Sequence, residues 1–191
     1  MATETGESTV RGTALPLVPG ALAGGAAWLV SYLLTYVLTS GTIQNSGLYK
    51  ALDAVNSAPP VWKLVGWLFY NAHVVNSDVP GLFGTTSVVN FISRVDAFSP
   101  VLYVVPPALL LAAGIVTARR SGLGSVAEAA TSGATVVVGY LPLSIVIAFL
   151  VRVPVGQQVA GPDLLTAVLL AGVLYPLVCG AVGGAIAQIA D

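Results

Sequence analysis

The segment LLTAVLLAGVLYPLVCGAVGGAIAQI, residues 164–189, contains no charged side chain. A helix needs about 20 predominantly apolar residues to cross the hydrocarbon core of a bilayer, which is about 30 Å thick. This segment is long enough to do so. Its glycines and its proline are tolerated in a membrane helix when neighbouring helices satisfy the freed backbone groups. The sequence therefore predicts a transmembrane helix at residues 164–189.

The composition of the whole chain also indicates that lipid surrounds most of the protein. Of the 191 residues, 56% are hydrophobic and only 8% are charged, whereas a soluble globular domain carries about 25% charged residues. So few charges cannot cover a surface that faces water. We therefore expect an integral protein of the cell membrane, whose main surroundings are the lipid bilayer.

Three other segments are clear candidates for transmembrane helices, namely residues 20–39, 99–118 and 126–151. Ser125 and Glu128 have the spacing of a capping box, which predicts that the third of these helices starts there. A further apolar segment, residues 61–75, is shorter than a usual span. It fits a short tilted span, a re-entrant helix buried between others, or an interfacial helix. The predicted fold is all-α and polytopic, with four to five transmembrane helices.

Two connecting segments have the pattern of short amphipathic surface helices. In residues 40–60, Leu48, Leu52 and Val55 recur at helical spacing, and residues 79–98 carry a similar apolar pattern. Helices of this kind lie at the boundary between lipid and water with their apolar side inward. We therefore expect each of these segments to form a surface helix.

The chain is expected to form one domain behind a short tail. Residues 1–13 are small, polar and mixed in charge, which predicts a flexible N-terminal tail, and residues 14–191 form a single transmembrane helical domain. With four spans, Arg119 and Arg120 share the side of both termini. The excess of basic residues on cytoplasmic loops then places both termini in the cytoplasm. A fifth span at residues 61–75 would remove most of this bias.

One polar stripe is a candidate functional site. Lys63, Gly66, Tyr70 and His73 recur at helical spacing and share one side of a helix. If the stripe lines an aqueous cavity, a lysine beside a histidine of pKa about 6.5 suits anion binding or proton relay. Alternatively, the Lys63 ammonium reaches the lipid headgroups and His73 lies at the wet end of the segment. Both interpretations stay open.

A stripe of small residues is a candidate packing face. Gly172, Pro176, Gly180 and Gly184 recur every four residues in the last predicted span. Such a stripe forms a smooth ridge that another helix can approach closely. We predict that this ridge packs against a second copy of the chain or against another membrane subunit.

Two predicted spans share a short pattern. GYLPL at residues 139–143 and VLYPLV at residues 173–178 each place a tyrosine just before a proline. Internal repeats of this kind occur in many transporters. Short helices built from Val, Leu, Ala and Gly also match by chance, and both explanations stay open.

The sequence gives no basis for catalysis or for a bound cofactor. One histidine and one cysteine, Cys179, are too few for the common zinc sites. The G-x-S-x-G, H-E-x-x-H and P-loop patterns do not occur. The net charge of −1 and the scattered basic residues disfavour nucleic acid as a partner. We therefore expect no catalytic residues, no cofactor, no metal site and no enzymatic activity.

Three stretches resemble a family of small uncharacterised multi-pass membrane proteins from halophilic archaea. They are WKLVGWLFYNAH at 62–73, VVVGYLPLS at 136–144 and DLLTAVLLAGVLYPLV at 163–178. The resemblance implies an archaeal cell membrane and no known activity, and it assigns no functional residues.

From the residues and the resemblance we expect an uncharacterised, non-enzymatic integral membrane protein. It would act by helix packing with itself, as a homo-oligomer, or with a partner subunit. The alternative is a small transporter or channel in which Lys63, Tyr70 and His73 face an aqueous cavity.

Overall fold

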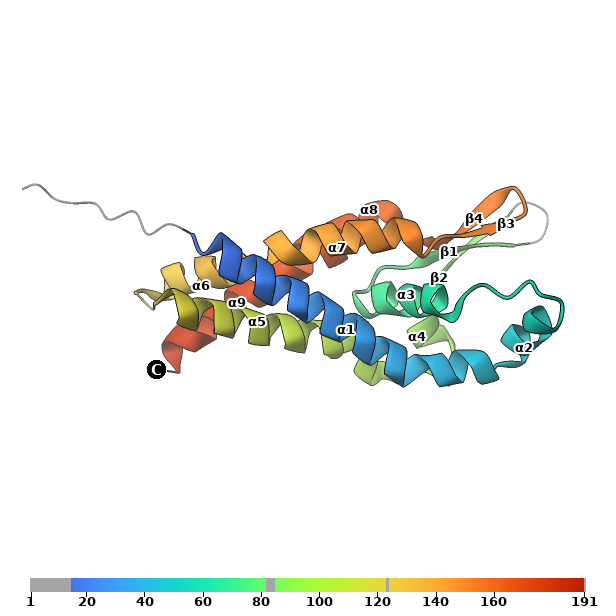
Figure 1. Ribbon diagram of the computed structural model, residues 1–191, viewed down its shortest axis with the longest axis horizontal. Coiled ribbons are helices and arrows are strands. Elements are labelled where there is room, and N and C mark those ends of the chain that lie inside the picture. Colours follow the sequence, from blue (N-terminus) through green and yellow to red (C-terminus); the bar gives the residue numbers. More distant parts are fainter. Residues whose placement is uncertain (1–14, 82–84, 123, 191) are drawn as a thin grey trace, which may run out of the picture.

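The structure is a computed structural model that describes residues 15–81, 85–122 and 124–190. A bundle of long helices forms one end of the molecule, and shorter helices with a small sheet form the other (Figure 1). Four helical segments are long and apolar enough to cross a membrane. They are Leu17–Asn45, Pro100–Ser121, Val126–Leu150 and Leu164–Ile189.

Several of these segments consist of more than one helical element. The elements of the bundle are α1 (Leu17–Asn45), the 3-10 helix η2 (Pro100–Tyr103), α5 (Val105–Ser121), α6 (Val126–Ala134), α7 (Val137–Leu150), α8 (Leu164–Thr166), the π-helix η3 (Ala167–Leu174) and α9 (Tyr175–Ile189). The predicted capping box is confirmed, because Ser125 Oγ accepts from the Glu128 N–H and Glu128 Oε2 accepts from the Ser125 N–H. It satisfies backbone donors at the start of α6.

The other end of the molecule, here called the end module, comes from two separate parts of the chain. Its elements are α2 (Gly47–Ala54), α3 (Val61–Ala72), β1 (Ser77–Pro80), β2 (Thr86–Val89), α4 (Phe91–Arg94), β3 (Val153–Val155) and β4 (Gln158–Pro162). The strands form one sheet in the order β2-β1-β4-β3. All pairs are antiparallel, and Asp78 of β1 pairs with Val88 on one side and Gly161 on the other. The sheet therefore ties the connection after α1 to the connection after α7.

The prediction of an all-α fold is wrong in the end module. Residues 79–98, expected to form a surface helix, contain the end of β1, β2 and the short helix α4. The β-branched residues Thr86, Val88 and Val89 favour an extended backbone. Strand β4, which lies far along the sequence, supplies the partner that makes the β1–β2 hairpin part of a larger sheet.

The ambiguous segment at residues 61–75 forms a short helix. Helix α3 has 12 residues and lies beside α1 and the sheet (Figure 1). It is not among the helices long enough to span a membrane. The described residues therefore contain four candidate spans. Residues 40–60 contain the end of α1 and the predicted short helix, now bounded as α2.

Helix α1 distributes its side chains in an unusual way. The buried residues are mostly small or polar, with Trp28 and Ile43 as the large exceptions. They are Gly20, Gly24, Ala27, Trp28, Ser31, Thr35, Thr39 and Ile43. The large apolar side chains instead point outward, among them Leu22, Leu29, Val30, Leu33, Leu34, Val37 and Leu38. Its small inner residues let α1 lie close to α7, where a Cβ at Gly24 would collide with the Val136 carbonyl.

Candidate functional site: a buried histidine between two tyrosines

Helix α3 covers the carboxyl end of α7. Lys63 Nζ donates to the Arg152 carbonyl at 3.0 Å, and Trp67 Nε1 donates to the Val151 carbonyl at 2.8 Å. The last carbonyls of a helix lack partners within the helix, and a cation near them is favourable. Between these contacts lies Gly66, where a Cβ would collide with the Val151 side chain. The absence of a side chain at Gly66 therefore allows α3 to lie close to the end of α7.

Deeper along the same contact, α3 and α1 both bind Ser144 of α7. The Tyr70 hydroxyl donates to the Ser144 carbonyl, and Trp28 Nε1 of α1 donates to Ser144 Oγ at 3.1 Å. All three residues are buried. Each buried polar group here has a partner, which avoids the cost of an unpaired group. Ser144 thus connects α1, α3 and α7.

His73 lies at the inner end of α3, where its side chain is fully buried. Its Nδ1 is 2.8 Å from the Phe69 carbonyl, and its Nε2 is 2.7 Å from the Tyr140 hydroxyl. A carbonyl can only accept, so Nδ1 carries the proton and Nε2 accepts from Tyr140. Burial lowers the pKa of His73 to about 4. His73 is therefore neutral near pH 7.

Aromatic rings enclose the imidazole. The Tyr175 ring centroid lies 5.1 Å from that of His73 in an edge-on arrangement, and the Phe69 centroid lies at 4.7 Å. Tyr140 and Tyr175 are the two tyrosines that precede Pro142 and Pro176 in the sequence. The two similar segments of the chain thus meet at one histidine.

Ser31 of α1 completes the cluster. Its side chain lies beside the Tyr140 hydroxyl. Nevertheless, the Ser31 Oγ forms no hydrogen bond with any of the described residues. Ser31 is fully buried. A buried hydroxyl without a partner costs about 1–3 kcal/mol. The Tyr140 oxygen donates to His73 and has a lone pair left, so it is an acceptor available beside this hydroxyl.

The predicted packing face lies elsewhere and is covered by the same chain. A Cβ at Gly180 would collide with the Gly133 carbonyl, and one at Gly184 with the Ala129 carbonyl, both on α6. Pro176 is also buried, and Gly172 lies against a leucine of α7. The ridge therefore holds α9 against α6 within one molecule. A second copy or another subunit would have to use a different surface.

Over residues 1–191 the chain matches the model of a family of unknown function, DUF7978. It belongs to this family. The chain is also similar to the uncharacterized PPE family protein PPE30 of Mycobacterium tuberculosis, in strains CDC 1551 / Oshkosh and ATCC 25618 / H37Rv. The identity is 32% over 134 residues, which is 65% of this chain and 28% of each relative. The chain thus spans about 28% of the length of these curated relatives. No solved structure matches it.

In this DUF7978 chain, Lys63, Tyr70 and His73 do lie on one side of α3. Tyr70 and His73 make hydrogen bonds to α7, and Lys63 donates to the Arg152 carbonyl just beyond its end. Sequence reasoning missed the residues on other helices that complete the cluster. These are Trp28, Ser31, Tyr140, Ser144 and Tyr175. The tyrosine before a proline in two spans was the one available signal, and it did not indicate a shared contact.

The cluster has the chemistry of a structural joint. Among the residues that the structure describes, no three His, Cys, Asp or Glu side chains lie together as a metal site requires. The neutral imidazole accepts from one phenol and donates to one carbonyl, so both nitrogens are occupied. What the cluster does in this DUF7978 chain is to hold α3 of the end module to the helical bundle.

Proposed function

We propose that this protein crosses the cell membrane four times and acts without catalysis, as a scaffold that packs with itself or with a partner subunit. The observation that carries the proposal is the reversed distribution of side chains on α1. Leu33 and Val37 are 60% and 75% exposed, whereas Ser31 and Thr35 are completely buried. In a water-soluble protein, large aliphatic residues are buried and Ser and Thr are mostly exposed. In lipid, exposed leucine has no such cost.

The same outward apolar surface continues on the other candidate spans. Its large exposed side chains on α5, α7, α8, η3 and α9 include Val116, Val138, Val146, Phe149, Leu165, Leu169, Val178, Val182 and Ile186. We call the exposed apolar side chains of the four spans the apolar belt. Large apolar side chains exposed along all four candidate spans are unusual for a soluble monomer, which rarely exposes large apolar patches. Hydrocarbon is the solvent that suits the apolar belt.

The bonds of α3 support a scaffold function. Tyr70 and His73 fix the end module to α7, and Lys63 fixes it to Arg152 just beyond that helix, so the module and the bundle form one unit. Because the glycine ridge is filled within the chain, a partner would contact either the apolar belt or the end module. The basic pair Arg119 and Arg120 favours termini in the cytoplasm, with the end module on the opposite side. The resemblance to proteins of halophilic archaea favours an archaeal membrane.

Two measurements test this proposal. Membranes from expressing cells are washed at alkaline pH, which removes peripheral proteins, and the pellet is then extracted with a mild detergent. We expect the protein to leave the membrane only with detergent. Cross-linking in intact membranes, followed by denaturing electrophoresis, tests packing with a second copy or a partner. Recovery in the alkaline wash would contradict the membrane assignment, and a cross-linked monomer alone would contradict the scaffold function.

A second candidate function is transport, and one observation favours it. Two candidate spans are irregular next to His73, because α6 and α7 are interrupted at Thr135 and Val136 and η3 is a π-helix that ends at Leu174. Interrupted helices mark the binding sites of many transporters. Transport along the stripe would require α3 to move away from α7, since the stripe is hydrogen-bonded to that helix.

Cysteine labelling separates the two functions. In a Cys179→Ala background, single cysteines replace each residue from 61 to 75, and a membrane-impermeant thiol reagent is applied from either side. Labelling at positions 63, 66, 70 and 73, with their neighbours protected, would support an aqueous path. Protection of positions 66, 70 and 73 would support the scaffold, because these residues face α7.

A further inference from the structure

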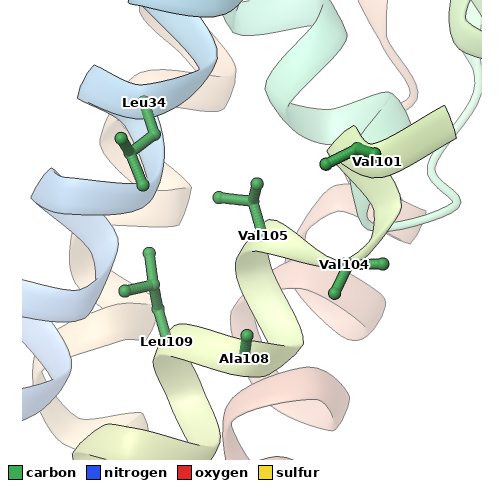
Figure 2. Close-up of a pocket in the computed structure, with 6 residues that line it drawn as sticks. All are labelled: Leu34, Val101, Val104, Val105, Ala108 and Leu109. Carbon is green, nitrogen blue, oxygen red and sulfur yellow. The ribbon is translucent and has the colours of Figure 1, made fainter. Parts of the chain in front are cut away.

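A shallow groove lies between α1 and the start of the second candidate span. Figure 2 shows Leu34 on α1 facing the side chains of η2 and α5 across it. Its volume is about 240 Å³. The lining residues are all aliphatic, namely Leu34, Val101, Val104, Val105, Ala108 and Leu109. Among the residues that the structure describes, no polar or charged side chain lines this groove.

The groove forms where the second span changes its helical form. The 3-10 helix η2 ends at Tyr103, and α5 begins at Val105 with Pro106 and Pro107 in its first turn. Proline lacks a backbone N–H, so it is accepted at the start of a helix but breaks an α-helix that continues through it. Val101 and Val104 therefore belong to a separate turn that forms the outer end of the groove.

The chemistry of the groove favours one kind of occupant. The aliphatic side chains that line the groove offer no hydrogen bond to water or to any other polar group. A thin, flexible and wholly apolar molecule suits an open groove with this lining. A hydrocarbon chain has these properties.

The groove also opens onto the surface where lipid is expected. Leu34, Val101 and Val104 are 41%, 61% and 61% exposed, and the neighbouring Leu33 and Val37 belong to the apolar belt. The groove lies near the end of the span, because Val101 directly follows Pro100, where the span begins. We propose that one hydrocarbon chain of a membrane lipid occupies this groove, with its headgroup at the membrane surface next to the end module. This inference rests on the proposed membrane location.

Two exposed alanines of α5 give a matched test. Ala108 lines the groove, and Ala112, one turn further along, is also exposed and does not line it. Ala108→Trp fills the groove, whereas Ala112→Trp adds the same side chain to the open surface. Each protein is reconstituted in phosphatidylcholine vesicles, extracted again in mild detergent and analysed by native mass spectrometry. We expect the wild type and Ala112→Trp to retain bound phosphatidylcholine and Ala108→Trp to lose it.

Equal retention in all three proteins, or no retention in the wild type, would overturn the proposal. Ala108→Leu is a smaller filling variant, which keeps the test valid if the tryptophan disturbs folding, and it too should lose lipid. Thermal unfolding in detergent identifies any variant that has not folded. Failure of the membrane assignment is distinguishable, because the protein would then be released by the alkaline wash before reconstitution.

Discussion

His73 Nε2 accepts a hydrogen bond from the Tyr140 hydroxyl at 2.7 Å, although 67 positions separate the two residues in the chain. This bond joins the inner end of α3 to the middle of a candidate span. The other imidazole nitrogen, Nδ1, donates a hydrogen bond to the Phe69 carbonyl of α3 itself. The orientation of the imidazole is therefore fixed by two partners, and the position of the end module depends on it.

Replacing Tyr140 by phenylalanine should destabilise the protein. The change keeps the ring and removes the donor, which leaves a buried imidazole nitrogen without its partner, at a cost of about 1–3 kcal/mol. The measurement is thermal or denaturant unfolding in detergent. Tyr36→Phe on the exposed side of α1 is the control and should have little effect. Equal effects of the two variants would contradict the structural importance of the bond.

Low pH should destabilise the folded protein, because His73 then takes up a proton. Burial lowers the pKa of His73 to about 4, whereas a histidine in the unfolded chain has a pKa of about 6.5. The unfolded chain therefore binds this proton more readily. The stability contributed by neutral His73 is complete above about pH 6.5 and is lost as the pH falls toward 4.

The measurement is the melting temperature in detergent across this pH range. A His73→Gln variant, which cannot take up the proton, should show a smaller decrease than the wild type. All other titratable groups are the same in both proteins, so the difference between the two pH profiles isolates the effect of His73. Identical pH profiles would show that protonation of His73 is not coupled to folding.

The contact between α6 and α9 should be sensitive to a single methyl group. At Gly184 a Cβ would collide with the Ala129 carbonyl, whereas at Gly41 of α1 no atom lies within 4 Å. Overpacking costs about 1–3 kcal/mol, so Gly184→Ala should lower the free energy of unfolding by that amount. Gly41→Ala should be neutral or stabilising, because alanine favours a helix. A reversed order of these two variants would contradict the helix arrangement.

Val74 should be a point where stability can be gained. It follows His73 with φ of +61°, a backbone conformation that costs a residue with a Cβ about 1–2 kcal/mol. The Val75 N–H bonds to the Tyr70 carbonyl and the Val74 N–H to the Asn71 carbonyl, which is the helix ending that normally has glycine at this position. Val74→Gly should therefore raise the melting temperature. A decrease would mean that the exposed valine side chain makes a stabilising contact with lipid or a partner.

The sequence was most informative where a feature depends on residues that are neighbours in the chain. The last span has the predicted bounds, Leu164–Ile189, because an uncharged segment of that length has few alternatives. The helix start at Ser125 was also predictable, since both halves of a capping box lie within four residues. The shared side of Lys63, Tyr70 and His73 followed from helical spacing alone.

Features that depend on distant partners were not predictable in the same way. Strands β1 and β3 have only four and three residues, and β1 pairs with β4 across a large separation in sequence. Periodicity over so few residues cannot distinguish a strand from a helix. Likewise, nothing local to His73 indicates Tyr140, and nothing local to Gly184 indicates that the chain's own α6 covers it.

If the protein crosses the membrane as proposed, the apolar belt faces lipid, and one labelling experiment distinguishes lipid from water at this surface. In the Cys179→Ala background, single cysteines replace Leu33, Val37 and Val146, which are 60%, 75% and 53% exposed on the protein surface. Ser57→Cys in the exposed connection after α2 is the accessible control. In intact vesicles we predict that a membrane-impermeant thiol reagent labels position 57 from one side and leaves positions 33, 37 and 146 unlabelled. Labelling of these three positions as fast as position 57 would show that the belt faces water and would contradict the account.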